Sequence, residues 1–401
     1  MTTILPFLKS LFPVSCHNRV ALVGGTVRDM LLGTESRDID LVAALTHGEL
    51  LALGFHRVEA SSSATIYFRH HQLFGKIEVT RIDRMEELEG DLRRRDFTIN
   101  AIALGLTGVQ FDPLGGEKDL KARLLKACSD SAFKGDPLRI FRAFRFEADG
   151  WLMAPDTAAL IRKDDWSTAF GAMPVERFSN EMLKALERKS PELFFQQMIS
   201  FNVGAEFLPE IFRMPSIPAG PLQHHPEGDL FSHSIQVLQR VATMSDDPLL
   251  RFCALFHDLG KLATDPAWYP KHHGHDNAGF DMAMKFCDRL RLPSPYRKGL
   301  AWVSSLHGTA NKWDELRDSS KISMAERAIK AGIIRILPLV AAADKAGGLP
   351  MTGWDDAVRV AGMSTLELGI DREKLEAMPV TTRPSFILQK RIEALRARLP
   401  A

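Results

Sequence analysis

The sequence has little cysteine, no excess of charge of one sign and no long apolar run. Its 401 residues include four cysteines, which lie far apart and form neither a metal-ligand nor a disulfide spacing, as suits a reducing compartment. Lysine and arginine total 51 against 50 for aspartate and glutamate, so no global field attracts nucleic acid, and any RNA contact must use a local basic patch. No run is long enough to span a bilayer, and residues 1–16 lack the long apolar core and cleavage site of a signal peptide. We therefore expect a cytoplasmic protein with no membrane partner.

The composition is otherwise that of a globular protein, with 45% hydrophobic and 25% charged residues. A chain of this length can bury a large core and form two or three domains. We find no internal repeat.

The most informative stretch covers residues 20–42, VALVGGTVRDMLLGTESRDIDLV. It begins with a short apolar run of strand type, which Gly24 and Gly25 interrupt before a segment with helical spacing. Glycines allow the backbone to come close to a triphosphate, and the helix start offers unpaired amide hydrogens to it. The pattern predicts a phosphate-binding turn.

A second predicted strand carries Asp38 and Asp40. Alternate residues of a strand share a face, so the two carboxylates project together, as a magnesium pair bound to phosphate oxygens requires. With the glycine turn, this pair predicts a site for nucleotidyl transfer.

A second block covers residues 92–104, LRRRDFTINAIAL. On a helix, Arg94, Arg95, Asp96 and Asn100 would lie near one face, with the apolar residues turned inward. Arginine forks suit phosphates, and an amide with a carboxylate can hold a ribose or brace the arginines.

A third block, GDPLRIFRAFRF at residues 135–146, predicts a helix with Asp136 near its start. Arg139, Arg142 and Arg145 recur every three residues and form a cationic stripe.

These blocks resemble the GGxVRD, DxD and RRDxxxNA motifs of the class II tRNA nucleotidyltransferases and bacterial poly(A) polymerases. The resemblance implies that Asp38 and Asp40 are catalytic and hold Mg²⁺. It also implies a set of nucleotide-binding residues: Gly24, Gly25, Arg28, Arg94, Arg95, Asp96, Asn100, Asp136, Arg139 and Arg142.

Two details of the resemblance concern single residues. In the family, Asp136 and Arg139 correspond to the EDxxR template that pairs with the edge of the incoming base, but position 135 is glycine where the motif has glutamate. Glu78 lies on a strand that neighbours the aspartate pair in the family, and is either a third acid near the metal or a solvated strand carboxylate.

A further set of histidines and aspartates begins after a linker rich in proline and glycine at residues 209–226. Imidazole and carboxylate ligands from several helices suit a transition-metal ion that activates water. Their order resembles that of the HD phosphohydrolase superfamily, which implies metal ligands at His233, His257, Asp258, His275, His307 and Asp344.

The resemblance implies an α+β chain: a head with a small mixed sheet, then an all-α neck and a helical HD domain. The expected divisions are residues 1–112 (head), 113–208 (neck), 209–350 (HD domain) and 351–401 (helical tail). The expected partners are tRNA, CTP and ATP, with a homodimer as a further expectation, and the expected reaction builds the tRNA 3′ CCA end.

Three alternatives stay open. Only RMEELEGD separates the strand IEVTRID from LRRRDFT, whereas enzymes that add all of CCA have a longer loop there, so the short loop resembles enzymes that add only CC. The others are a poly(A) polymerase, and an HD phosphodiesterase that keeps the head for RNA binding.

Overall fold

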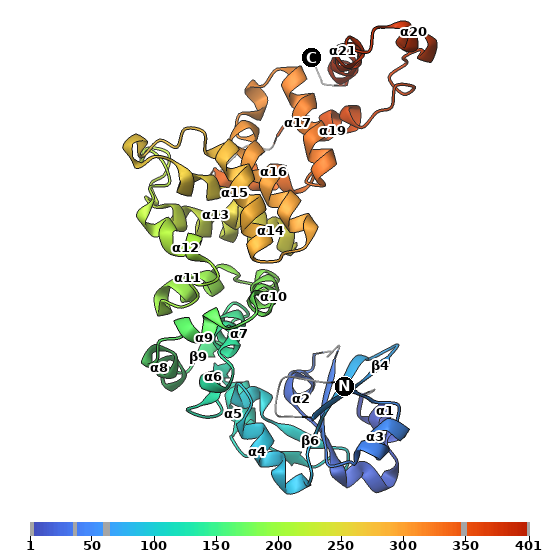
Figure 1. The fold of residues 1–401 in the computed structure, drawn as a ribbon, viewed down its shortest axis with the longest axis vertical. Coiled ribbons are helices and arrows are strands. Elements are labelled where there is room, and N and C mark those ends of the chain that lie inside the picture. Colours follow the sequence, from blue (N-terminus) through green and yellow to red (C-terminus); the bar gives the residue numbers. More distant parts are fainter. Residues whose placement is uncertain (1–3, 35–37, 59–64, 346–350, 399–401) are drawn as a thin grey trace. The chain divides into compact units, whose positions relative to one another are not determined.

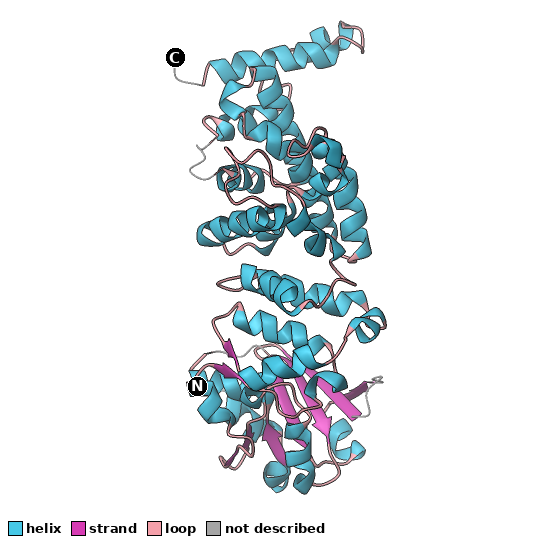
Figure 2. Cartoon of the chain, turned by 90° about the vertical axis from the view of Figure 1, so that its left-hand side faces the viewer, coloured by secondary structure: helices cyan, strands magenta, loops and turns pink. Residues whose placement is uncertain are grey.

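The computed structural model describes residues 4–34, 38–58, 65–345 and 351–398. The chain divides into two compact units, Met1–Trp166 and Ser167–Ala401 (Figure 1). All strands of the described residues lie in the first unit, and the second is helical (Figure 2). The predicted α+β class is confirmed, while the bounds of the four expected domains stay predictions.

A seven-stranded mixed sheet forms the centre of the first unit, in the order β3-β4-β5-β2-β1-β6-β7. β2 and β5 are parallel, and the other neighbours are antiparallel. The strands are β1 (Val20–Leu22), β2 (Ile39–Ala43), β3 (His56–Val58), β4 (Thr65–His71), β5 (Gly75–Arg81), β6 (Ala103–Gly105) and β7 (Gln110–Phe111). β4 and β5 form an antiparallel hairpin.

Both faces of the sheet are buried against apolar clusters. Because side chains alternate between the two faces of a strand, neighbouring residues belong to different clusters. In β2, Ile39, Leu41 and Ala43 belong to one buried apolar cluster, whereas Val42 belongs to another. Asp40 shares the face of Val42, so its carboxylate projects on the side of the second cluster.

Helices precede and connect these strands: α1 (Ile4–Leu11), α2 (Gly24–Leu32), α3 (His47–Ala52) and α4 (Leu88–Arg93). The remainder of the unit contains α5 (Gly116–Lys121), α6 (Ala132–Gly135), α7 (Leu138–Glu147) and α8 (Pro155–Lys163), with the short parallel pair β8 (Leu124–Leu125) and β9 (Leu152–Met153). Apart from this pair, the predicted neck range is helical.

The second unit consists of helices whose bounds are α9 (Ser167–Gly171), α10 (Val175–Leu186), α11 (Glu192–Phe201), α12 (Pro209–Arg213), α13 (Leu230–Met244), α14 (Pro248–Phe256), α15 (His275–Arg289), α16 (Ser294–Ala310), α17 (Asp318–Ala331), α18 (Ile336–Asp344), α19 (Trp354–Ala361), α20 (Arg372–Ala377) and α21 (Arg383–Arg396). Asp229 and Asp247 cap α13 and α14 by accepting backbone amide hydrogens. No described helix is long and apolar enough to cross a membrane.

Candidate functional site

The predicted aspartate pair lies where β2 begins. Asp40 is in the strand, but Asp38 directly precedes it, because its carbonyl accepts a hydrogen bond from the Thr26 hydroxyl at 3.0 Å instead of joining the ladder. The same hydroxyl accepts from the backbone amide of Asp40 at 3.1 Å. Thr26 thus fixes the backbone between the two aspartates. Its side chain is almost completely buried, which indicates a positioning role that the sequence motif did not reveal.

The glycine turn brings the start of α2 against this pair. Gly24 has φ of +69°, which side chains rarely tolerate, and a Cβ there would lie 3.0 Å from both Asp40 Oδ2 and Arg95 Nη1. Only glycine allows the backbone at position 24 to lie this close to both the Asp40 carboxylate and the Arg95 guanidinium. The phosphate-binding turn and the acid therefore meet at one point.

Burial raises the pKa of the Asp40 carboxyl; Arg95 opposes the shift, while Glu78 and Asp38 add to it. A divalent cation beside Asp40 would stabilise its ionised form, because it would offset both the burial and the two neighbouring negative charges.

The RRD block does not form one helix. α4 ends at Arg93, Arg94 is its C-cap, and Asn100 ends a separate 3-10 turn. The helical spacing predicted for these residues is therefore wrong, because the chain turns at Arg94 and carries Asp96 to a buried position. Arg95 instead contacts Asp91 through Nε and Nη2 at 3.2 and 3.1 Å.

Asp96 is the centre of a buried network. Its Oδ2 accepts from Arg142 Nε at 2.8 Å, and its Oδ1 accepts from Asn100 Nδ2 at 3.0 Å. The Asn100 oxygen in turn accepts from Arg28 Nη1 at 2.7 Å. Burial would raise the pKa of Asp96, but Arg142 and these hydrogen bonds hold it well below its usual range. The network joins α2, the RRD block and α7.

The Arg139 side chain contacts the backbone of the RRD block. Its Nη2 donates to the carbonyl of Arg94 at 2.6 Å, and its Nη1 donates to the carbonyls of Ala132 and Arg95 at 2.9 and 3.3 Å. Asp136 Oδ1 accepts from the Leu138 amide at the start of α7. Two members of the predicted stripe, Arg139 and Arg142, thus contact the RRD block.

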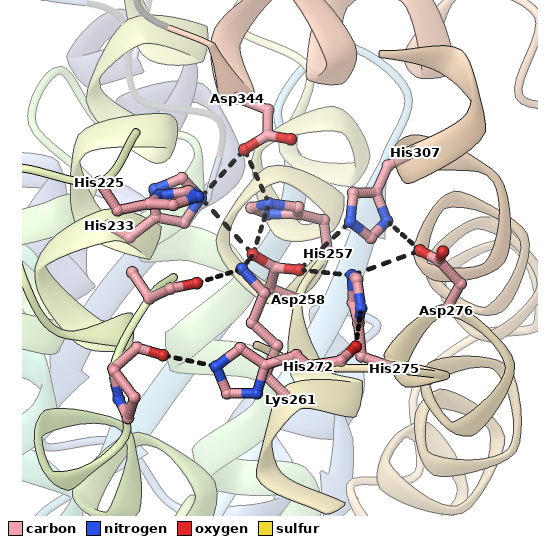
Figure 3. Close-up of polar contacts among 12 residues, drawn as sticks. His225, His233, His257, Asp258, Lys261, His272, His275, Asp276, His307 and Asp344 are labelled. Atoms are coloured by element: carbon pink, nitrogen blue, oxygen red, sulfur yellow. Dashed lines mark hydrogen bonds and ion pairs between the residues drawn. The ribbon is translucent and has the colours of Figure 1, made fainter. Parts of the chain in front are cut away.

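In the second unit, the six predicted HD residues come together from five segments of the chain (Figure 3). His233 Nε2 lies 3.0 Å from Asp344 Oδ1 and 3.6 Å from Asp258 Oδ2, and His257 Nε2 lies 3.4 and 3.3 Å from the same two oxygens. These four side chains can supply ligand atoms within 4.8 Å of one another.

A second group shares Asp258. Its Oδ1 lies 3.2 Å from His307 Nε2 and 3.5 Å from His275 Nε2, and these three residues also have metal-ligand spacing. Asp258 therefore faces two sets of histidines with its two oxygens. The close approach of α15 depends on Gly260, whose Cβ would lie 2.0 Å from the His275 carbonyl.

The donor set fits a metal ion. His233 Nε2, His257 Nε2 and Asp258 Oδ1 are buried and lack a hydrogen-bond partner among the described residues. Unpaired buried polar atoms are costly unless something else binds them, and imidazole with carboxylate is the usual donor set of a transition metal.

The charged groups of this cluster change one another's pKa. Burial would lower the pKa of His257, but Asp258 and Asp344 raise it to about 10. Burial would raise the pKa of Asp258, but the Lys261 ammonium, with Nζ 2.6 Å from Asp258 Oδ2, and His257 hold it well below its usual range. A bound cation would take the place of the protons on the imidazoles.

A polar pocket of about 450 Å³ lies beside this cluster and is formed by the starts of α15 and α17 and by α16. Asp276 belongs to its wall and also lies 3.4 Å from His275 Nε2. Ser319, Ser323 and Arg327 line it, and Arg327 makes no hydrogen bond or ion pair with any described residue. The sequence did not predict this pocket, because its lining residues form no recognisable motif.

Family models match both regions. Residues 56–126 match the poly A polymerase head domain, and residues 230–345 match the HD domain. Both domains imply the use of divalent metal.

Two relatives are similar over most of the chain. The multifunctional CCA protein of Methylococcus capsulatus is 36% identical over 326 residues, which are 76% of each chain. The multifunctional CCA protein of Thioalkalivibrio sulfidiphilus is 37% identical over 325 residues, covering 76% of this chain and 78% of the relative.

Solved structures share the fold. A CCA-adding enzyme in an apo form has a TM-score of 0.66 at 20% identity, covering 95% of this chain and 87% of that one. The Thermotoga maritima CCA-adding enzyme complexed with tRNA has a TM-score of 0.64 at 20% identity, covering 96% and 88%.

Proposed function

Since the chain belongs to the family of the multifunctional CCA proteins, we propose that it is a tRNA nucleotidyltransferase that builds or repairs the 3′ CCA end of tRNA from CTP and ATP. The single observation that carries the proposal is the meeting of Gly24, Asp40 and Arg95 at one point of the head. That point combines a phosphate-binding turn, a metal-binding acid and a cation for the triphosphate.

In this mechanism Asp38 and Asp40 would hold Mg²⁺, which when bound would neutralise phosphate charge and make the attacking hydroxyl more acidic. The tRNA 3′ oxygen bonds to the α-phosphorus while its proton passes to water and the bond to pyrophosphate breaks. The Gly24 turn and Arg95 hold the phosphates in line with that attack. Asp91 orients Arg95 through two hydrogen bonds.

The base is read by Asp136 and Arg139 on the start of α7. Because Arg139 already donates to the carbonyls of Arg94 and Arg95, the template is tied directly to the phosphate-binding block. Arg28 and Asn100 brace that block through the Asp96 network. Specificity for tRNA comes from duplex shape and backbone contacts, since A-form RNA offers little sequence to read.

The second site is proposed to be an HD phosphohydrolase that holds a divalent transition metal through His233, His257, Asp258, His275, His307 and Asp344. Its metal supplies an activated water for attack on a phosphoester. The unpaired buried atoms of this cluster support a bound cation.

A cytoplasmic location is supported by four free, buried cysteines. The homodimer stays a prediction that light scattering on the purified protein would test.

The bases added are tested with tRNA that lacks its 3′ end, incubated with CTP alone, ATP alone or both and resolved to one nucleotide. Complete CCA addition predicts a three-nucleotide product with both.

The alternative of CC-only addition depends on the connection between β5 and α4, which is short and consists of residues 82–87. A product that stops after two cytidines would support a CC-adding enzyme. A long ladder with ATP alone would support poly(A) synthesis, and no incorporation at all would contradict a transferase.

A further inference from the structure

The four histidines of the HD cluster share one feature: each has its Nδ1 engaged. His257, His275 and His307 direct Nδ1 to the carbonyls of Ala254, His272 and Ser304, at 2.8, 2.7 and 2.9 Å. Each of these carbonyls lies three residues earlier in the chain. Because a carbonyl only accepts, Nδ1 carries the proton and Nε2 is left with a lone pair, which is the tautomer that a metal needs.

His233 differs from the other three. Its Nδ1 lies 2.7 Å from Glu227 Oε1, so its partner is a carboxylate and not a backbone carbonyl. The Glu227 side chain is 8% exposed, and the His233 side chain is 2% exposed. On the opposite edge of the ring, His233 Nε2 faces Asp344 and Asp258.

Glu227 directly follows residues 209–226, which the sequence predicted to be a linker. Lys261 Nζ donates to the carbonyl of Ala219 at 2.6 Å, and His272 Nε2 lies 2.8 Å from the carbonyl of Pro218. The amide of Ala219 donates to the carbonyl of Gly228 at 2.9 Å. Lys261 also contacts Asp258, so the segment that carries Glu227 is anchored to the metal-ligand cluster itself.

We propose that Glu227 is a positioning residue for the HD metal, acting through His233. A carboxylate that accepts the Nδ1 proton fixes the ring orientation and makes Nε2 a stronger donor to the metal than a neutral carbonyl would. Among the described residues, Glu227 is the one carboxylate within hydrogen-bond distance of the Nδ1 of a ligand histidine. The other three histidines direct Nδ1 to backbone carbonyls, and the Asp276 carboxylate lies 3.7 Å from His307 Nδ1, beyond hydrogen-bond reach. The inference rests on the proposed HD metal site.

A competing arrangement uses the same residues as ligands. His225, Glu227 and His233 also have metal-ligand spacing, and His225 Nδ1 lies 3.0 Å from Glu227 Oε1. A metal on His233 Nδ1 would leave the ring proton on Nε2, which would then donate to Asp344 and could not bind the metal held by His257, Asp258 and Asp344. Positioning keeps Nε2 free for that metal, which favours it.

The test is Co²⁺ binding to the full chain in an Asp40→Ala background, which removes the head's competing metal site. Affinity is measured by competition with a chromophoric chelator, and stoichiometry by visible absorption. We expect Glu227→Ala to weaken Co²⁺ binding by about 10- to 100-fold with unchanged stoichiometry. Glu227→Gln keeps an acceptor oxygen and should lose less. The matched control is Glu210→Gln, a carboxylate of the same unit that pairs with Arg289 and should bind Co²⁺ as the parent does.

Three outcomes would overturn the inference, and they are distinguishable. If Glu227→Ala and Glu227→Gln both bind like the parent while His257→Ala does not bind, the metal site stands and the positioning role is wrong. If Glu227→Ala loses a whole equivalent of Co²⁺, Glu227 is a ligand. If the parent binds no Co²⁺, the proposed HD metal site fails as well. Thermal unfolding of the metal-free variants identifies any that do not fold.

Discussion

Asp40 and Glu78 are directly paired across the parallel strands β2 and β5. The pairing places Glu78 beside the acid that is predicted to be catalytic, which favours the prediction of a third acid over that of a solvated carboxylate. Glu78 also forms an ion pair with Lys76, and the two residues shift the pKa of Asp40 in opposite directions.

This pairing predicts opposite effects on pH dependence. The raised pKa of Asp40 means that protons compete with Mg²⁺ as the pH falls, so incorporation should decline on the acid side. Glu78→Gln removes a charge that raises this pKa, and should move the acid limb to lower pH. Lys76→Gln should move it to higher pH. The measurement is the pH profile of CMP incorporation at subsaturating Mg²⁺; shifts of the same sign in both variants would contradict the electrostatic account.

The two sites should be separable by substitution. Asp40→Ala should abolish nucleotide incorporation because it removes a metal-binding acid from the head, yet leave hydrolysis of a phosphodiester unchanged. His257→Ala should do the reverse. Both reactions are measured on each purified variant, with Thr34→Ala as an exposed control in the head. Loss of both activities in either variant would count against two independent sites.

The buried Asp96–Arg142 pair should contribute to stability more than its neighbours on α7. Arg142→Ala leaves the Asp96 carboxylate without its cation, and should lower the free energy of unfolding by about 1 to 3 kcal/mol at pH 7, a figure reduced because Arg142 is partly exposed. Arg145→Ala, one turn along the stripe, is the control. Since the pKa of Asp96 is lowered in the folded state, this contribution is fully present above the usual carboxyl pKa, declines as the pH falls below it, and is lost only as the pH falls through the much lower pKa of the folded state. Urea unfolding at pH 7 and pH 2 tests the sign; an equal loss at both would mean that the pair acts only through packing.

Much of this arrangement was predictable because short-range patterns determine it. The alternation of β2 and the glycine turn follow from spacing, whereas the HD ligands were implied by the resemblance to a superfamily, and the structure brings all six HD residues together. The RRD helix was wrong because side-chain spacing does not reveal that a buried Asp96 needs a turn at Arg94 to reach Arg142. Thr26 and Glu227 were missed because their partners lie on other segments, and only the folded chain brings them together. Arg327 was missed because the pocket that it lines is formed by separate helices.

The polar pocket beside Asp276 predicts a role for Arg327 in substrate binding. Its guanidinium has no partner among the described residues, and the serine hydroxyls around it suit a phosphate group. Arg327→Ala should raise the KM for phosphoester hydrolysis about 10-fold and leave Co²⁺ affinity unchanged, a loss of the size expected for one charged hydrogen bond. Arg317→Ala, outside the pocket, is the control. Equal KM values for Arg327→Ala and the wild type would exclude the pocket as the substrate site.

Glu147 at the end of α7 should make the first unit less stable as the pH rises. Burial raises the pKa of its carboxyl to about 7, and Oε2 has no hydrogen-bond partner among the described residues. The unfolded chain ionises at the usual carboxyl pKa, so the folded state loses stability from that pH up to about 7 and no more above it. Glu147→Gln should therefore match the wild type at pH 4 and exceed its free energy of unfolding by about 1 to 3 kcal/mol at pH 8. Asp149→Asn is the control at the same helix end. A difference that does not change with pH would show that Glu147 stays ionised in the folded protein.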